Sequence, residues 1–225
     1  MDPMADLVAA LKAGDESKAR AVLAKHPGVV NVPAPGGNSL LMMAIFARAT
    51  KVVDTLRAMG VKPDMAEAAA LGDTARVREL AKGDPTLVRT GGKTGTAPLH
   101  LAAHYGHEET AKVLLNLGAD IRFLGTPFGN TALHAALAGG QDRTADLLLR
   151  AGADPNTKDN NGFTPLIIAA ANGSAAGVRA LLAKGADPAA KDAKGKTAMD
   201  HAREREEDDV VVLLSTAIPS QVQRK

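Results

Sequence analysis

The chain repeats itself with a period of roughly 33 residues, and this repeat constrains the fold more than any other feature. The stretch Ala97–Gly106 recurs, with changes, further along the chain. The copies start at evenly spaced positions, 97, 131, 164 and 197. A leucine stands at the same place in each copy, at Leu114, Leu148, Leu181 and Leu214. A period of this length predicts a solenoid, in which each unit buries its apolar face against its neighbours.

Weaker copies extend the same register upstream. One starts near Ala5, another near Ser39, and a shortened copy starts near Pro63, closer to Ser39 than the period allows. We therefore predict one domain over residues 1–217, with units starting near 5, 39, 63, 97, 131, 164 and 197. Residues 218–225 have no partner unit and are predicted to form a flexible tail. The missing segment of the short copy also predicts a notch between the loops at 27–38 and 86–96.

Each unit has the pattern of a helix, a tight turn, a second helix and a loop. Thr164 is suited to cap a helix N-terminus, and Pro165 fits the first helical position. Gly106 and Gly173 predict a left-handed turn after the first helix. The chain is 45% apolar, yet it has only five aromatic residues and no Trp. The predicted core is therefore built from alanine and aliphatic side chains.

Composition excludes several functions. The chain has no Cys, which excludes disulfides, cysteine-ligated metals and thiol catalysis. Its net charge of +2 gives no reason to expect nucleic acid or a membrane as a partner. The N-terminal stretch Met1–Asp6 carries acid where an export signal would carry Lys or Arg. We expect a cytoplasmic location, with export as the alternative if a leader was removed.

The repeat resembles the ankyrin-repeat family, and bacterial members in particular. The stretch Gly95–Asp120 carries the family pattern of Thr-Pro-Leu-His, Gly-His, Leu-Leu and Gly-Ala-Asp with one change, Ala97 for Thr. Gly129–Asp154 and Gly162–Asp187 match it nearly as well, whereas Met42 replaces the His of its unit. The resemblance implies an all-α repeat solenoid of about seven helix-turn-helix units with hairpin-like finger loops, one unit being shortened. Finger tips and first helices would line a concave binding face.

The resemblance also implies which residues contact a partner. These residues stand just before the Thr-Pro-Leu-His motif, or just before the glycine that ends the first helix of a unit. They are Phe46, Thr96, His104, Tyr105, Pro127, Phe128, Asn130, Asn160, Asn161, Phe163, Asn172, Lys194 and Lys196. Rigid aromatic side chains on a polar face are typical of binding hot spots, although such residues are also common fillers of the motif. Finger lysines indicate an acidic partner surface; they are Lys93, Lys158, Lys191, Lys194 and Lys196.

The sequence thus predicts a monomeric, non-enzymatic module without a cofactor, which binds an unknown folded protein. An enzyme that the chain masks or inhibits is one such partner. Two alternatives stay open. The first is a scaffold that associates with itself, and the second is a metal-dependent enzyme that uses His104 with His100 and His107. The resemblance implies structural roles for His100, His107 and also His134, which leaves His104 as the surplus histidine.

Two other motifs fail on inspection. Gly91–Thr94 looks like the end of a phosphate-binding loop, but Leu87 stands where that loop needs glycine. Asp154–Pro165 looks like a calcium loop, but Lys158 and Pro165 occupy positions that need oxygen ligands. Neither motif predicts a site.

Overall fold

Fourteen α-helices, stacked as seven pairs, make up the computed structural model over the residues that it describes, which are 2–32, 37–89, 97–125 and 127–217. The first helices of the pairs are α1 (Pro3–Lys12), α3 (Leu40–Phe46), α5 (Met65–Leu71), α7 (Pro98–His104), α9 (Ala132–Ala138), α11 (Pro165–Ala171) and α13 (Ala198–Glu204). The second helices are α2 (Glu16–Lys25), α4 (Thr50–Ala58), α6 (Thr74–Gly83), α8 (Glu108–Asn116), α10 (Asp142–Arg150), α12 (Ala175–Ala183) and α14 (Asp208–Ala217). Short 3₁₀ helices follow α2 at Pro27–Asn31 and α6 at Pro85–Val88.

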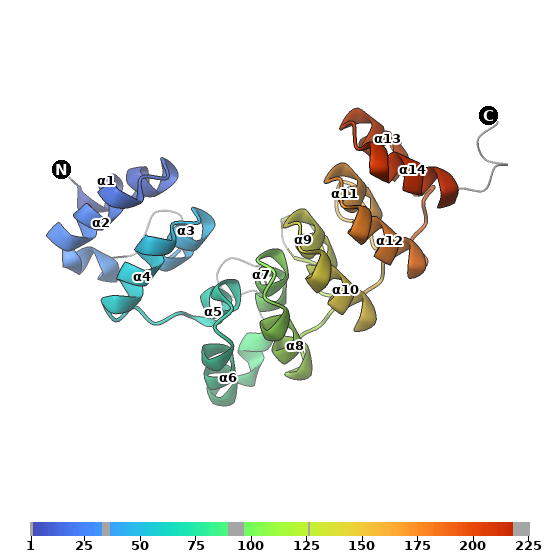
Figure 1. Ribbon diagram of the computed structural model, residues 1–225. Helices are drawn as coiled ribbons and strands as arrows, with labels where there is room; N and C mark the ends of the chain where they lie inside the picture. The colour runs from blue at the N-terminus through green and yellow to red at the C-terminus, as the bar shows by residue number, and fades with distance from the viewer. Residues whose placement is uncertain (1, 33–36, 90–96, 126, 218–225) are drawn as a thin grey trace.

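The pairs form an open arc (Figure 1). First helices lie along its inner rim and second helices along its outer rim. The four leucines that mark the repeat are fully buried, as are the paired alanines Ala102 and Ala103. Small alanines let neighbouring first helices approach closely. The prediction of an all-α repeat solenoid is confirmed. None of the helices in the described ranges combines the length and the apolar character that a bilayer crossing requires.

Polar side chains start most of the first helices. The Thr164 hydroxyl accepts the Ile167 N–H at 3.3 Å, which satisfies one free donor at the start of α11. Asp64 caps α5, and Glu67 returns a bond to the Asp64 N–H at 2.8 Å. Ala97 stands at the start of α7 and supplies no such bond. This unit therefore lacks a cap that its neighbours have.

A residue with a left-handed backbone joins the two helices of each pair. Glycine fills this position in five pairs, with φ between 67° and 78° at Gly14, Gly72, Gly106, Gly140 and Gly173. Arg48 and Glu206 fill it in the other two, with φ of 53° and 60°. A side chain makes this conformation costly by about 1 kcal/mol. The strained Arg48 lies next to the irregular part of the solenoid.

That irregularity lies between α4 and α5, and we call it the short joint. Only residues 59–64 connect these two helices, whereas the connections between the other pairs are more than twice as long. This confirms the prediction of one shortened unit. The loops expected to flank a notch lie partly outside the described residues. At all the other joints, the second helices of neighbouring pairs pack against each other. Only α4 and α6 hardly touch among the described helices. The outer layer of the solenoid is therefore interrupted at the short joint.

Candidate binding site at the short joint and the fingers

Two buried histidines hold neighbouring units together. The His134 Nε2–H donates to the Phe163 carbonyl of the next unit at 3.1 Å. Its Nδ1 accepts the Thr131 hydroxyl at 2.8 Å. Burial lowers the pKa of His134, so the ring is neutral at pH 7. This histidine has a structural role.

His100 makes the same bond one unit earlier, where its Nε2–H donates to the Asn130 carbonyl at 2.8 Å. Its Nδ1 is buried and has no partner among the described residues, because Ala97 brings no hydroxyl to it. Burial lowers the pKa of His100 as well. His107 bonds the Ala70 carbonyl at 2.9 Å. Two of the three clustered histidines are thus engaged with the backbone. Within the described part of the chain, no three or more metal-ligating side chains are arranged to hold an ion.

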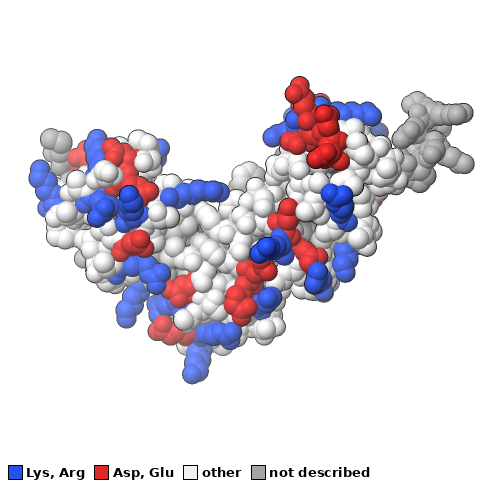
Figure 2. Space-filling view, viewed as in Figure 1, with Lys and Arg blue, Asp and Glu red and all other residues white. Residues whose placement is uncertain are grey.

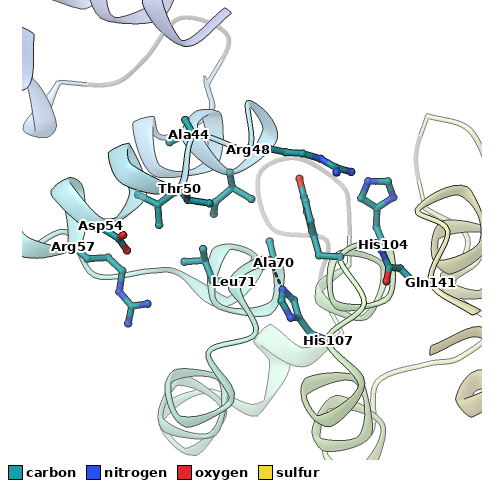
Figure 3. A pocket seen from close by; sticks show the side chains of 14 residues that line it. Ala44, Arg48, Thr50, Asp54, Arg57, Ala70, Leu71, His104, His107 and Gln141 are labelled. Carbon is teal, nitrogen blue, oxygen red and sulfur yellow. Dashed lines mark hydrogen bonds between the residues drawn. The ribbon is translucent and has the colours of Figure 1, made fainter. Parts of the chain in front are cut away.

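A pocket of about 430 Å³ lies at the short joint (Figure 3). Small and aliphatic residues of α3, α4, α5 and the turn between α3 and α4 form its floor: Ala44, Ile45, Ala49, Val53, Ala70 and Leu71. Polar residues complete the lining: Arg48, Thr50, Asp54, Arg57, His104, Tyr105, His107 and Gln141. The pocket is therefore lined by the second unit, by α5 of the shortened third unit and by the end of α7 in the fourth unit.

One end of the pocket carries hydrogen-bonding groups that have no partner within the described ranges. The Arg48 side chain extends across it towards His104 (Figure 3). Among the described residues, the Arg48 guanidinium, the His104 ring and the Tyr105 hydroxyl have no hydrogen-bond partner. Burial raises the pKa of the half-buried Tyr105, against the opposing effect of Arg48, so its hydroxyl stays protonated at neutral pH. The His104 and Tyr105 rings meet edge to face, 5.0 Å apart.

The other end of the pocket differs in charge. Arg57 pairs with Asp73 at 2.8 Å and so connects α4 with the start of α6 across the short joint. Asp54 lies beside Arg57 on the pocket wall (Figure 3). The positive charge available to a ligand is therefore at the Arg48 end.

A second surface lies on the finger between α8 and α9. The Gly125 N–H donates to the Asn130 carbonyl at 2.7 Å and closes a tight turn. Phe128 projects from this turn and is 61% exposed. The Asn160 backbone and side chain hold the same turn, with bonds of 2.9 Å to the carbonyls of Phe128 and Pro127. The fold therefore fixes the backbone behind an exposed aromatic ring.

The other predicted contact residues are distributed unevenly. Phe46 is 52% exposed at the end of α3. Phe163 is half-buried and packs on the His201 ring at 5.3 Å. The exposed Asn161 and Lys194 lie on successive fingers, joined where the Asn161 carbonyl accepts the Ala193 N–H at 2.9 Å.

The remaining predicted contact residues include two whose side chains are engaged within the chain. The Asn172 amide donates to the Leu137 carbonyl at 3.0 Å, and Lys196 pairs with Glu204. Thr96 and Lys93 lie outside the described residues. The structure thus brings His104 and Tyr105 together at the pocket, and Phe128, Asn130 and Asn160 together on the fingers.

Sequence reasoning missed Arg48, which dominates the polar end of the pocket. A signal was present, because Arg48 stands where most units have glycine. It also missed Arg57 and Asp73, since no spacing rule indicates that α4 and α6 separate.

These features define a helical repeat solenoid with candidate binding surfaces on its inner rim. The family pattern described as "Ankyrin repeats (3 copies)" matches residues 65–159, and "Ankyrin repeats (many copies)" matches residues 148–202. The chain belongs to the ankyrin-repeat family, whose repeats are generally protein–protein interaction modules. The first match begins at Met65, directly after the short joint.

A curated relative shares part of the repeat array. It is the "Transient receptor potential cation channel subfamily A member 1 homolog" of Caenorhabditis elegans, 47% identical over 53 residues. The match covers 24% of this chain and 4% of that protein. At a period of roughly 33 residues, the similarity is therefore confined to fewer than two repeat lengths.

Proposed function

We propose that the chain is a non-enzymatic module that binds a folded protein on its concave face as a monomer. Fingers and the inner rim would contact the partner, and an enzyme that is masked or inhibited by this contact is the partner class to test first. The visible hollow of the arc is mostly uncharged, with acidic and basic side chains mixed over the rest of this face (Figure 2). Neither sign of charge dominates the side of the arc seen in this view.

The exposed ring of Phe128 carries this proposal. The Phe128 side chain is 61% exposed, so most of its apolar surface is uncovered in the free chain. Its backbone is held by Asn160, so little conformational entropy would be lost on binding. Rigid, exposed aromatic rings are the residues that most often dominate binding energy.

Immobilised full-length chain tests the proposal by affinity capture from lysate of the organism that encodes it. We expect Phe128→Ala to lose about tenfold or more of the captured partner relative to the wild type. Val212→Ala is the matched control, because Val212 is 63% exposed on the outer helix α14. Equal capture by both variants would remove Phe128 from the site.

Two further measurements test the finer parts of the proposal. The activity of a captured enzyme, with and without added chain, shows whether binding masks it. Light scattering over a range of concentrations separates a monomer from a self-associating scaffold. A mass that rises with concentration would favour the scaffold.

A further inference from the structure

The pocket at the short joint combines two features that single out one kind of ligand. Its floor is apolar and built from short side chains such as Ala44, Ala49 and Val53. At one edge stands the Arg48 guanidinium with two further hydrogen-bonding groups, Tyr105 and His104, none of them with a partner among the described residues. A pocket of this size suits one apolar side chain together with its flanking backbone.

Arg48 occupies its place at a conformational cost. Its φ of 53° belongs to a region that glycine fills in five of the seven units. The space at the equivalent glycines varies: a Cβ at Gly72 would meet the His107 ring and one at Gly106 would meet Gln141, whereas a Cβ at Gly14 or Gly140 would meet nothing within 4 Å. The open short joint has room for a side chain. Strained backbone that presents a charge over a pocket is a feature of binding sites.

We propose that this pocket binds an apolar side chain of the partner protein and that Arg48 pairs with the carboxylate of the acidic residue beside it. The inference rests on the proposed function, because it specifies the segment by which the partner docks. Arg48 supplies a planar, bidentate donor for a carboxylate, and the Tyr105 hydroxyl adds a third donor.

The charges around the pocket determine at which end the acidic residue of the partner segment binds. Asp54 repels a carboxylate from the far end, and Arg57 there already pairs with Asp73 at 2.8 Å. His107 also faces the pocket, but its Nε2 is bonded to the Ala70 carbonyl at 2.9 Å. The acidic residue of the segment therefore lies at the Arg48 end, with the apolar side chain over the floor.

Two short peptides test the chemistry directly. Ac-Ser-Leu-Asp-Ser-NH2 and its neutral isostere Ac-Ser-Leu-Asn-Ser-NH2 are titrated into the full chain and followed by the backbone amide signals of Ala49, Leu71 and Tyr105. We expect the Asp peptide to bind about tenfold more tightly than the Asn peptide, since its bond to Arg48 is charge-assisted. Ac-Ser-Ser-Asp-Ser-NH2, which lacks the apolar side chain, should bind about tenfold more weakly than the Leu-Asp peptide.

Arg48→Gly is the decisive variant, because glycine is the usual residue at this position and suits its backbone. It should abolish the preference for Asp over Asn. Glu206→Gly makes the same replacement at the equivalent position of the last unit, far from the pocket, and should keep the full preference. Tyr105→Phe removes one neutral hydrogen bond and should weaken binding of the Asp peptide by about threefold.

Equal binding of the Asp and Asn peptides by the wild-type chain would overturn the proposal, as would a preference that survives in Arg48→Gly. Free N-acetylleucine binding more tightly than the Leu-Asp peptide would overturn it too, because the pocket would then be a small-molecule site. Failure of these titrations leaves the Phe128 capture result untouched, so the pocket and the proposed function fail separately.

Discussion

The joint between α7 and α9 and the short joint connect neighbouring units by different means. At the first, a full-length finger is present, His100 bonds the next unit at 2.8 Å, and the first helices pack closely. At the short joint the finger is missing and Met42 replaces the histidine. A hydrogen bond from the Ser39 hydroxyl to the Glu67 carboxylate and the Arg57 ion pair replace these contacts.

This difference shows how a repeat protein can gain a site by losing contacts. In a regular joint, the next unit covers the apolar faces of both helices of a pair. At the short joint α4 and α6 hardly touch, and apolar residues of α3, α4 and α5 form the floor of a pocket there. A solenoid is stabilised mainly by nearest-neighbour contacts. The same joint should therefore be the weakest interface of the array.

The largest expected effect comes from replacing equivalent leucines on either side of the short joint. Leu41 and Leu133 occupy the same motif position and are both fully buried. Leu41→Ala and Leu133→Ala should each cost about 3 kcal/mol of local stability. Because the short joint couples its two sides weakly, Leu41→Ala should expose α1–α4 and leave α5–α14 protected, whereas Leu133→Ala should lower protection across α5–α14.

Residue-resolved hydrogen exchange measures both variants on the full chain. The wild type sets the reference protection for each helix. If Leu41→Ala lowered protection equally from α1 to α14, the short joint would couple its neighbours as strongly as a regular joint does, and the comparison would fail.

A change of pH should act on the two kinds of joint in opposite directions. Burial lowers the pKa of His100 and His134 from 6.5, so their stabilising contribution is present above pH 6.5 and is lost as the pH falls below it. Burial raises the pKa of Glu67 from 4.5, more than its hydrogen bonds lower it. The short joint therefore gains stability as the pH falls through the raised value.

Urea unfolding at pH 7.5, 6.0 and 5.0, followed by helix-resolved amide signals, measures this effect. Each histidine should contribute about 1.4 kcal/mol for every pKa unit of its shift. We expect α7–α11 to lose stability on acidification while the contact of α3 with α5 does not. His134→Gln is the control, because it should reduce the loss around α9 and α11. Parallel loss at both joints would contradict the assignment.

Sequence reasoning predicted much of this fold and less of the site. The period, the leucines and the Gly-Ala-Asp endings predict the helix pairs and the short connection, because these features depend on residues close together in the chain. The pocket depends on how α4 and α6 sit across the short joint, and no spacing in the sequence reports that. Tyr105 and His104 were predicted contacts, and both line the pocket. Phe163 was also a predicted contact, but it is half-buried against His201, and only the folded structure shows that these two distant residues meet.

The smallest expected effect comes from restoring the usual threonine at the start of α7. Ala97→Thr would place a hydroxyl at the start of α7, where Thr131 has one at the start of α9. That hydroxyl can donate to the buried His100 Nδ1, which has no partner in the described part of the chain, whereas the His100 backbone N–H already bonds the carbonyl of residue 97 at 3.0 Å. We expect about 1 kcal/mol more stability, measured by urea unfolding, because a buried acceptor gains a hydrogen-bond donor. Thr131→Ala is the mirror variant; it removes the hydroxyl bond to the His134 Nδ1 and the helix cap, while the backbone N–H of residue 131 still donates to that nitrogen at 3.2 Å, and it should cost about 1 kcal/mol. If Ala97→Thr were neutral while Thr131→Ala was destabilising, the joint at His100 would have adapted to the missing hydroxyl.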